Sequence, residues 1–174
     1  MVSVAAVASR LERAWALLDR VLDPEVPVVS VRDLGIVRDG VEDDAGGLTV
    51  VVTPTYSGCP ATEVIEASIV AALEEGGLGP VRVEMRRAPA WTTDWMSEKG
   101  KRQLREYGIV PPGPVKAPSV APLRFVPRPK PVALACPRCE SLQTERIAAF
   151  GATACKALWR CTACGEPFEH FKPI

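Results

Sequence analysis

Residues 48–75 read LTVVVTPTYSGCPATEVIEASIVAALEE and contain a strand–loop–helix pattern. It opens with an apolar, β-branched run that is typical of a buried strand, and it passes through a short loop that contains Cys59. In the helical pattern that follows, Ile65, Ile69 and Leu73 recur on one face, and glutamates occupy another. A glycine pair at 76–77 ends this helix. We therefore predict a strand followed by a helix over residues 60–75, with a cysteine at the junction.

Four further elements are predicted around this strand and helix. Residues 9–22 form an amphipathic helix. Residues 30–37, SVRDLGIV, form a strand that an acidic, glycine-containing connection joins to the strand beginning at residue 48 as a hairpin. Residues 81–85 form a third strand, and residues 93–107 a third helix. The order αββαβα predicts an α+β fold, in which a small sheet has helices packed on one side.

A proline-rich stretch divides the chain. Residues 111–131 hold eight of the 17 prolines, so they can form neither a regular helix nor a sheet and are expected to extend as polyproline II. We interpret this stretch as a semi-rigid linker; the alternative is a docking ligand for an aromatic groove. The predicted domains are therefore residues 1–110, a linker over 111–132, and a cysteine-rich module over 133–174.

The cysteine-rich module contains two CxxC pairs, Cys136 with Cys139 and Cys161 with Cys164. Each two-residue spacing lets one tight turn direct two thiolates at a single ion, and two such turns complete a tetrahedral site with four sulfur ligands. The segment is too small to fold on its core alone, which favours metal ligands over four buried structural thiols. The pattern predicts a zinc-ribbon-like module, and zinc is favoured over iron.

Cys155 lies in this module but belongs to neither CxxC pair. It lies six positions before Cys161, so on a regular strand both would share a face, and Cys155 is a candidate extra ligand of an iron or iron–sulfur site. The alternative, a small apolar filler, is slightly favoured. The single histidine, His170, lies between phenylalanines and is interpreted as structural.

Cys59 is followed by Pro60, and proline favours the first position of a helix. Cys59 is therefore predicted to be the N-cap, with its sulfur facing the free amides of Ala61 and Thr62. That setting would lower the thiol pKa. Two interpretations of Cys59 are open at this point: it is a reactive thiolate, or it is a small residue that fills a tight turn.

Charge and hydropathy exclude several classes of protein. Net charge is zero, although residues 1–107 hold 12 basic and 17 acidic residues and residues 108–174 hold nine and four. The basic residues of the second part form no stripe, so a nucleic-acid-binding ribbon is a weak alternative. There is no signal-peptide pattern and no apolar run of membrane-spanning length, so we expect a cytoplasmic protein without a membrane partner.

Several segments resemble the PaaD family, whose members are encoded with the multicomponent phenylacetyl-CoA oxygenase (epoxidase) of aerobic phenylacetate degradation. DPEVPVVSVRDLGIV at 23–37 and TPTYSGCPA at 53–61 are similar to the iron–sulfur assembly domain shared with SufT. AWTTDWMSEKGK at 90–101, FGATACKALWRC at 150–161 and CGEPFEHFK at 164–172 resemble PaaD itself. The resemblance covers nearly the whole chain.

The resemblance implies a role for particular residues. It implies an assembly domain in which Cys59 handles iron or sulfur as a transient ligand or transfer thiol, and a C-terminal metal module. The neighbours of Cys59 that fall in the matched motifs are Asp23, Glu25, Asp33 and Thr55.

The chain lacks the motifs of the catalytic components of such a system. It has one histidine and no Glu-x-x-His pair for a di-iron centre, and no G-x-G-x-x-G fingerprint for a reductase. We therefore expect a non-catalytic accessory protein that assembles or maintains iron or iron–sulfur centres, with oxygenase components or the reductase as partners. A structural or docking subunit is the alternative. A thiol-dependent enzyme is disfavoured because the first domain offers no histidine base. A homodimer is left open.

Overall fold

The computed structural model describes residues 9–56, 58–114 and 133–174. The chain divides into two compact units, Met1–Trp91 and Thr92–Ile174. Most of the predicted proline-rich linker lies outside the described residues. Within the described part, no helix is long and apolar enough to cross a membrane.

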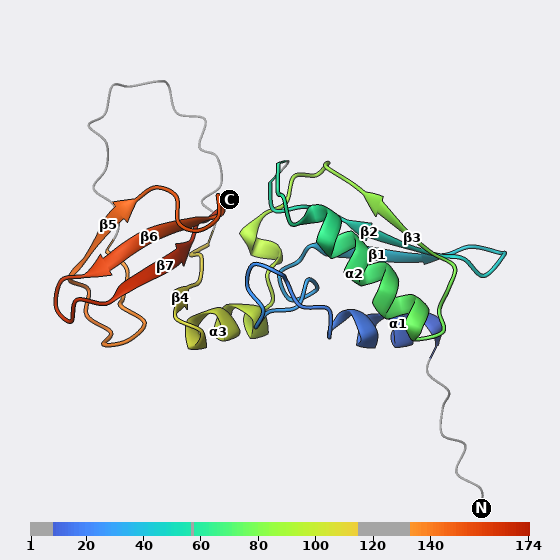
Figure 1. The fold of residues 1–174 in the computed structure, drawn as a ribbon, viewed down its shortest axis with the longest axis horizontal. Coiled ribbons are helices and arrows are strands. Elements are labelled where there is room, and N and C mark those ends of the chain that lie inside the picture. Colours follow the sequence, from blue (N-terminus) through green and yellow to red (C-terminus); the bar gives the residue numbers. More distant parts are fainter. Residues whose placement is uncertain (1–8, 57, 115–132) are drawn as a thin grey trace, which may run out of the picture. The chain divides into compact units, whose positions relative to one another are not determined.

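The first unit contains a three-stranded sheet in the order β1-β2-β3 (Figure 1). Its strands are β1 (Val37–Glu42), β2 (Leu48–Val52) and β3 (Val81–Met85). β1 and β2 pair antiparallel, whereas β2 and β3 pair parallel and are connected by α2 (Thr62–Glu75). A parallel pair needs such a crossover, and it brings the carboxyl ends of β2 and β3 to one edge of the sheet.

Both helices of the first unit pack on one face of this sheet. A Cβ built on Gly40 of β1 would lie 3.5 Å from the indole of Trp15 in α1 (Arg10–Leu18). α2 contacts both α1 and β3, and its buried face carries Ile65, Ile69 and Leu73. Polar side chains of Asp39, Thr49, Arg82 and Glu84 alternate with the apolar residues and point to the other face. The predicted sheet with helices on one side is confirmed.

The first strand lies later in the chain than predicted. Residues 31–35 form turns, because the Ser30 hydroxyl donates to the Asp33 carboxylate at 2.9 Å and accepts the Asp33 amide at 3.0 Å. Gly35 then has a φ of 72°, which a strand does not contain. β1 therefore begins at Val37, and the hairpin loop shrinks to residues 43–47, where the Asp43 carboxylate accepts two amides.

The first helix is shorter than predicted. A capping box formed by Ser9 and Glu12 starts α1, and the helix ends at Leu18 rather than at residue 22. The following turn is held by the Asp23 carboxylate, which accepts the amides of Glu25 at 2.9 Å and Val26 at 2.8 Å. The helix itself ends in a tighter turn, in which the amides of Arg20 and Val21 donate to the carbonyls of Leu17 and Leu18.

The second unit contains the other helical and strand elements. These are the 3₁₀-helix Thr93–Trp95, α3 (Glu98–Glu106), β4 (Ile109–Val110), β5 (Thr144–Ala148), β6 (Lys156–Cys161) and β7 (Pro167–Phe171). Its sheet has the order β4-β7-β6-β5 (Figure 1). Since β4 pairs with β7, residues 92–110 belong to the unit of the cysteine-rich ribbon, whereas the sequence placed them in the first domain. The α+β class and the C-terminal ribbon are as predicted.

Candidate thiol pocket and metal centre

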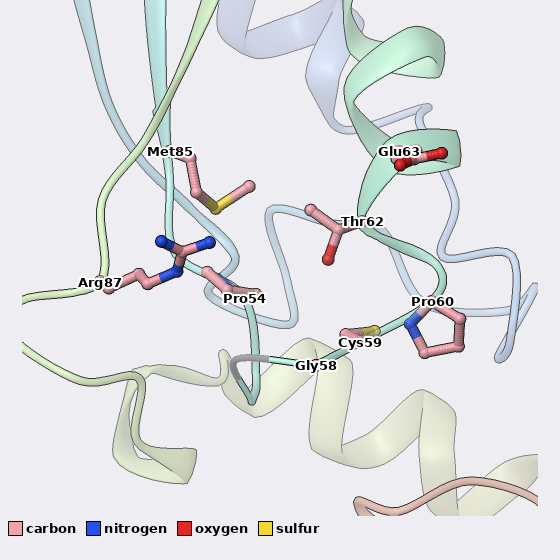
Figure 2. A pocket seen from close by; sticks show the side chains of 8 residues that line it. All are labelled: Pro54, Gly58, Cys59, Pro60, Thr62, Glu63, Met85 and Arg87. Carbon is pink, nitrogen blue, oxygen red and sulfur yellow. The ribbon is translucent and has the colours of Figure 1, made fainter.

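Cys59 lies in the loop between β2 and α2, at the edge of the sheet where β2 and β3 end. A pocket of about 510 Å³ opens there (Figure 2). Its lining residues are Pro54, Gly58, Cys59, Pro60, Thr62, Glu63, Met85 and Arg87. In open α/β sheets, the carboxyl edge of parallel strands is the usual place for ligands.

The predicted N-cap position of Cys59 is wrong. The N-cap of α2 is Ala61, which has helical dihedral angles and no side-chain cap, and the helix begins at Thr62. Cys59 instead lies in a turn: its amide donates to the Tyr56 carbonyl at 3.3 Å, and its carbonyl accepts the Thr62 amide at 3.3 Å. Pro60 is therefore outside the helix, because this additional turn lies between the cysteine and the first helical residue.

The pKa of the Cys59 thiol is raised, not lowered. Burial is the largest cause, and the negative charges of Glu25 and Asp23 raise the pKa further. Hydrogen bonds from the Ala61 amide and the Tyr56 side chain to the sulfur offset only part of this. At neutral pH the group is a protonated thiol that can bind a metal by losing its proton.

The structure brings two of the four predicted neighbours into electrostatic reach of Cys59. Glu25 and Asp23 both act on its thiol, although the Asp23 side chain also accepts the two amides of its own turn. Asp33 is buried in the turn with Ser30, and Thr55 is half-buried in the loop and does not line the pocket.

Met85 and Arg87 form the wall of the pocket opposite Cys59 and Thr62 (Figure 2). The sequence reasoning missed both residues. Met85 is the last residue of β3 and pairs in register with Val52 of β2. The strand–helix–strand order of residues 48–85 was the signal that could have found them, because a helical crossover places the end of β3 beside the loop after β2.

In the second unit, four cysteine sulfurs form a compact cluster. The Sγ atoms of Cys136, Cys139, Cys161 and Cys164 all lie within 4.8 Å of one another. The Cys136–Cys164 and Cys139–Cys161 sulfur pairs are 3.8 Å and 3.6 Å apart. A tetrahedral ion with metal–sulfur bonds of about 2.3 Å requires sulfurs about 3.8 Å apart. The spacing therefore fits a tetrahedral metal site.

The two CxxC turns have the same backbone geometry. In the first, the Glu140 amide donates to the Cys136 carbonyl at 2.9 Å; in the second, the Gly165 amide donates to the Cys161 carbonyl at 2.9 Å. One cysteine of each pair is buried and the other exposed. Each of the two turns thus contributes one buried and one exposed cysteine to the cluster.

The local environment favours a thiolate at Cys161. Burial raises its pKa, but hydrogen bonds from the Cys164 and Ala163 amides, together with those of the Cys164 and Cys139 thiols, outweigh burial and lower the pKa to about 7. Metal ligands must be deprotonated, so amide donors at the sulfurs suit metal binding.

Cys155 and His170 lie outside this cluster. Cys155 precedes β6 and is buried, and its sulfur is 3.0 Å from the Thr153 hydroxyl. Six residues of strand span about 20 Å, so sharing a face with Cys161 does not place it near the metal site. His170 packs edge-on against Trp159, with ring centres 6.3 Å apart, and burial lowers its pKa.

Comparison with known proteins gives a family match in each unit of the chain. Residues 11–85 match the family model described as iron–sulfur cluster assembly protein, and residues 124–172 match the PaaD zinc beta ribbon domain. The chain is 45% identical to an Escherichia coli protein whose name describes it as a putative subunit of 1,2-phenylacetyl-CoA epoxidase, over 95% of this chain and 94% of that protein.

Two further matches concern the first unit. The chain is 34% identical to a Porphyromonas gingivalis protein named Fe-S protein maturation auxiliary factor, over 51% of this chain and 84% of that protein. A solved structure of a domain of unknown function, DUF59, from Bacillus anthracis covers 55% of this chain and 91% of its own, with 27% identity and a TM-score of 0.51.

These features define a class of protein with two parts. One is an iron–sulfur assembly domain that has a thiol in a pocket, and the other is a zinc-ribbon domain with a cluster of four cysteines. The chain belongs to the PaaD family, and the predicted resemblance to that family is confirmed.

Proposed function

We propose that this protein is a non-catalytic accessory factor of the phenylacetyl-CoA oxygenase (epoxidase) system and helps to load or maintain its iron or iron–sulfur centres. The observation that carries the proposal is the free thiol of Cys59 in an open pocket of an assembly-type domain. The names of the relatives support it: one is a putative epoxidase subunit and another an Fe-S maturation factor.

In this proposal the two cysteine sites have different tasks. Cys59 is a transient ligand or transfer thiol for iron-containing cargo, and Glu25 and Asp23 supply negative charge close to it. The four cysteines of the ribbon hold zinc, because a closed set of four sulfurs leaves no open position for chemistry. The ribbon then serves to dock an oxygenase component or the reductase.

A structural or docking subunit of the working oxygenase is the second candidate. The ribbon exposes the large apolar side chains of Leu142, Ile147 and Phe150, a composition that suits a protein interface. A thiol-dependent enzyme is less well supported, because the only histidine is in the ribbon and a protonated Cys59 is a weak nucleophile.

The two candidates differ in when the protein is needed. Oxygenase components are purified from cells that contain the protein, lack it, or carry Cys59→Ser, and their iron, sulfide and activity are measured. The maturation role predicts folded components short of metal in the last two cases, while Cys155→Ala, a buried thiol outside the pocket, leaves loading normal. Fully loaded and active components from deficient cells contradict maturation. A requirement for the protein in each turnover supports the subunit role instead.

A further inference from the structure

The strand β3 differs from the other strands that lie at a sheet edge. Among the described residues, the two sheets end at β1, β3, β4 and β5 (Figure 1). β1 and β5 each contain a shift in register, and β4 is only two residues long. Short strands and bulges are devices that keep an open edge from pairing with another chain. β3 has neither, because its five residues pair with β2 without any shift.

The outer edge of β3 presents the backbone groups of Val81, Val83 and Met85. β2 donates an amide to the Pro80 carbonyl at 2.9 Å and accepts the Arg86 amide at 2.8 Å, so the even-numbered residues here bond to β2. Successive residues of a strand direct their backbone groups to opposite sides. The amides and carbonyls of the odd-numbered residues therefore face away from β2, and no described residue pairs with them.

Two side chains of β3 on the face without helices carry opposite charges. Arg82 is exposed and makes no ion pair or hydrogen bond to any residue that the structure describes. Glu84 accepts two hydrogen bonds from Arg86, at 3.3 Å and 2.9 Å, but both go to Oε1. Its Oε2 is therefore available to a second guanidinium. Arg82 and Glu84 lie symmetrically on either side of Val83.

This symmetry makes the edge complementary to itself. When two β3 strands pair antiparallel, their outward-facing residues must lie opposite each other. If the pair is centred on Val83, Arg82 of each copy lies opposite Glu84 of the other, at the positions where cross-strand side chains approach most closely. A shift by two residues in either direction puts Arg82 opposite Arg82, or Glu84 opposite Glu84, and like charges directly opposite are destabilising. The charges thus select a single register.

We propose that β3 is the interface of a homodimer, in which two copies of this chain pair their β3 strands antiparallel about Val83 and form one continuous sheet. The interface is isologous, since each copy contributes the same residues. The side chains of Val81, Val83 and Met85 are only half-buried in the single chain, and the added strand buries them further. This inference does not depend on the proposed function of Cys59.

The dimer has a consequence for the thiol pocket. Met85 lines that pocket, and in this register the residue opposite Met85 is Val81 of the second copy. The second copy therefore lies beside the pocket wall.

The test measures self-association of the full chain, supplied with zinc, by sedimentation equilibrium over a range of concentrations. We expect the unaltered protein to dimerise. Arg82→Glu and Glu84→Arg should each weaken dimerisation by about tenfold, because each puts like charges opposite one another at both symmetric positions. An equimolar mixture of the two variants should dimerise again, since opposite charges then face each other. Arg146→Glu, the same charge change on the exposed edge strand β5, should have no effect.

Hydrogen exchange tests the same edge without any substitution. The amides of Val81, Val83 and Met85 should exchange more slowly as the concentration of the unaltered protein rises. A protein that stays monomeric at every concentration overturns the inference, as does a dimer whose β3 amides gain no protection. A dimer that Arg146→Glu disrupts places the contact at β5 and also overturns it. Loss of the dimer in both β3 variants without recovery in their mixture excludes the register about Val83.

Discussion

Glu140 and Gly165 occupy the same place in the two CxxC turns of the ribbon. Each follows the second cysteine of its pair, has a positive φ, 61° and 81° respectively, and donates its amide to the carbonyl of the first cysteine at 2.9 Å. One turn thus fills this position with glycine and the other with a residue that is sterically strained there, since the left-handed region disfavours a Cβ. The paired turns, not any single cysteine, set the geometry of the metal site.

Gly165→Ala is expected to lower the free energy of unfolding of the metal-loaded ribbon by about 1 kcal/mol, because alanine is strained at this φ. Glu140→Gly removes a Cβ from the equivalent position and should cause no comparable loss. Thermal unfolding of the zinc-loaded protein measures both. Equal losses in the two variants would show that the left-handed residue is not the relevant feature of the turns.

Removal of the metal should unfold the ribbon and leave the first unit intact. The cluster of Cys136, Cys161, Ala157, Trp159 and Phe168 is the small core of this part of the chain, and two of its five members belong to the four-cysteine cluster. Without the ion, the cysteine thiolates repel one another, and the remaining core is too small to keep the ribbon folded. Amide spectra after treatment with a strong chelator should lose dispersion for residues 133–174 and keep it for α1 through β3. Retained dispersion in the ribbon would contradict metal-dependent folding.

A buried ion pair joins β6 to β7. The Lys156 ammonium lies 2.7 Å from the Glu169 carboxylate, with side chains only 5% and 22% exposed. Glu169→Gln should lower the free energy of unfolding by about 3 kcal/mol, because it leaves the Lys156 charge buried and unpaired. The added change Lys156→Met should recover much of this loss. The exposed pair of Arg160 and Glu145 provides the control: Glu145→Gln should cost no more than about 0.5 kcal/mol in the same unfolding measurement.

Local patterns were sufficient to predict the four-cysteine cluster and most of the elements. The CxxC spacing acts within one turn, so the four cysteines that lie together could be named before any fold was known. β2, α2 and β3 follow from apolar periodicity in the same way. The first strand was misplaced because SVRDLGIV has a strand-like composition, whereas the hydrogen bonds between Ser30 and Asp33 decide in favour of turns.

The pocket depends on contacts that local patterns do not contain. Met85 and Arg87 reach Cys59 only through the parallel pairing of β2 and β3, more than 20 residues apart in the chain. The predicted N-cap failed for a different reason: proline at position 60 is compatible both with the first helical turn and with a turn just before it. The sequence could not decide between these two conformations, and they have opposite consequences for the thiol.

Cys59 should stay protonated at neutral pH. Because burial and the charges of Glu25 and Asp23 raise its pKa, the midpoint of the alkylation rate against pH should lie above that of an ordinary thiol, not near neutral pH. Nearby negative charge disfavours the thiolate and so raises the thiol pKa. Removing such a charge must therefore lower the midpoint. Glu25→Gln should therefore lower the midpoint, whereas Glu63→Gln, which lines the pocket but is not among the largest causes of this shift, should lower it less. Rates are measured against pH in zinc-loaded protein carrying Cys155→Ala, so that Cys59 is the one thiol free to react. A midpoint near pH 7 would support the hypothesis of a reactive thiolate at Cys59. An equal shift of the midpoint in both variants would show that Glu25 has no specific effect on the thiol pKa.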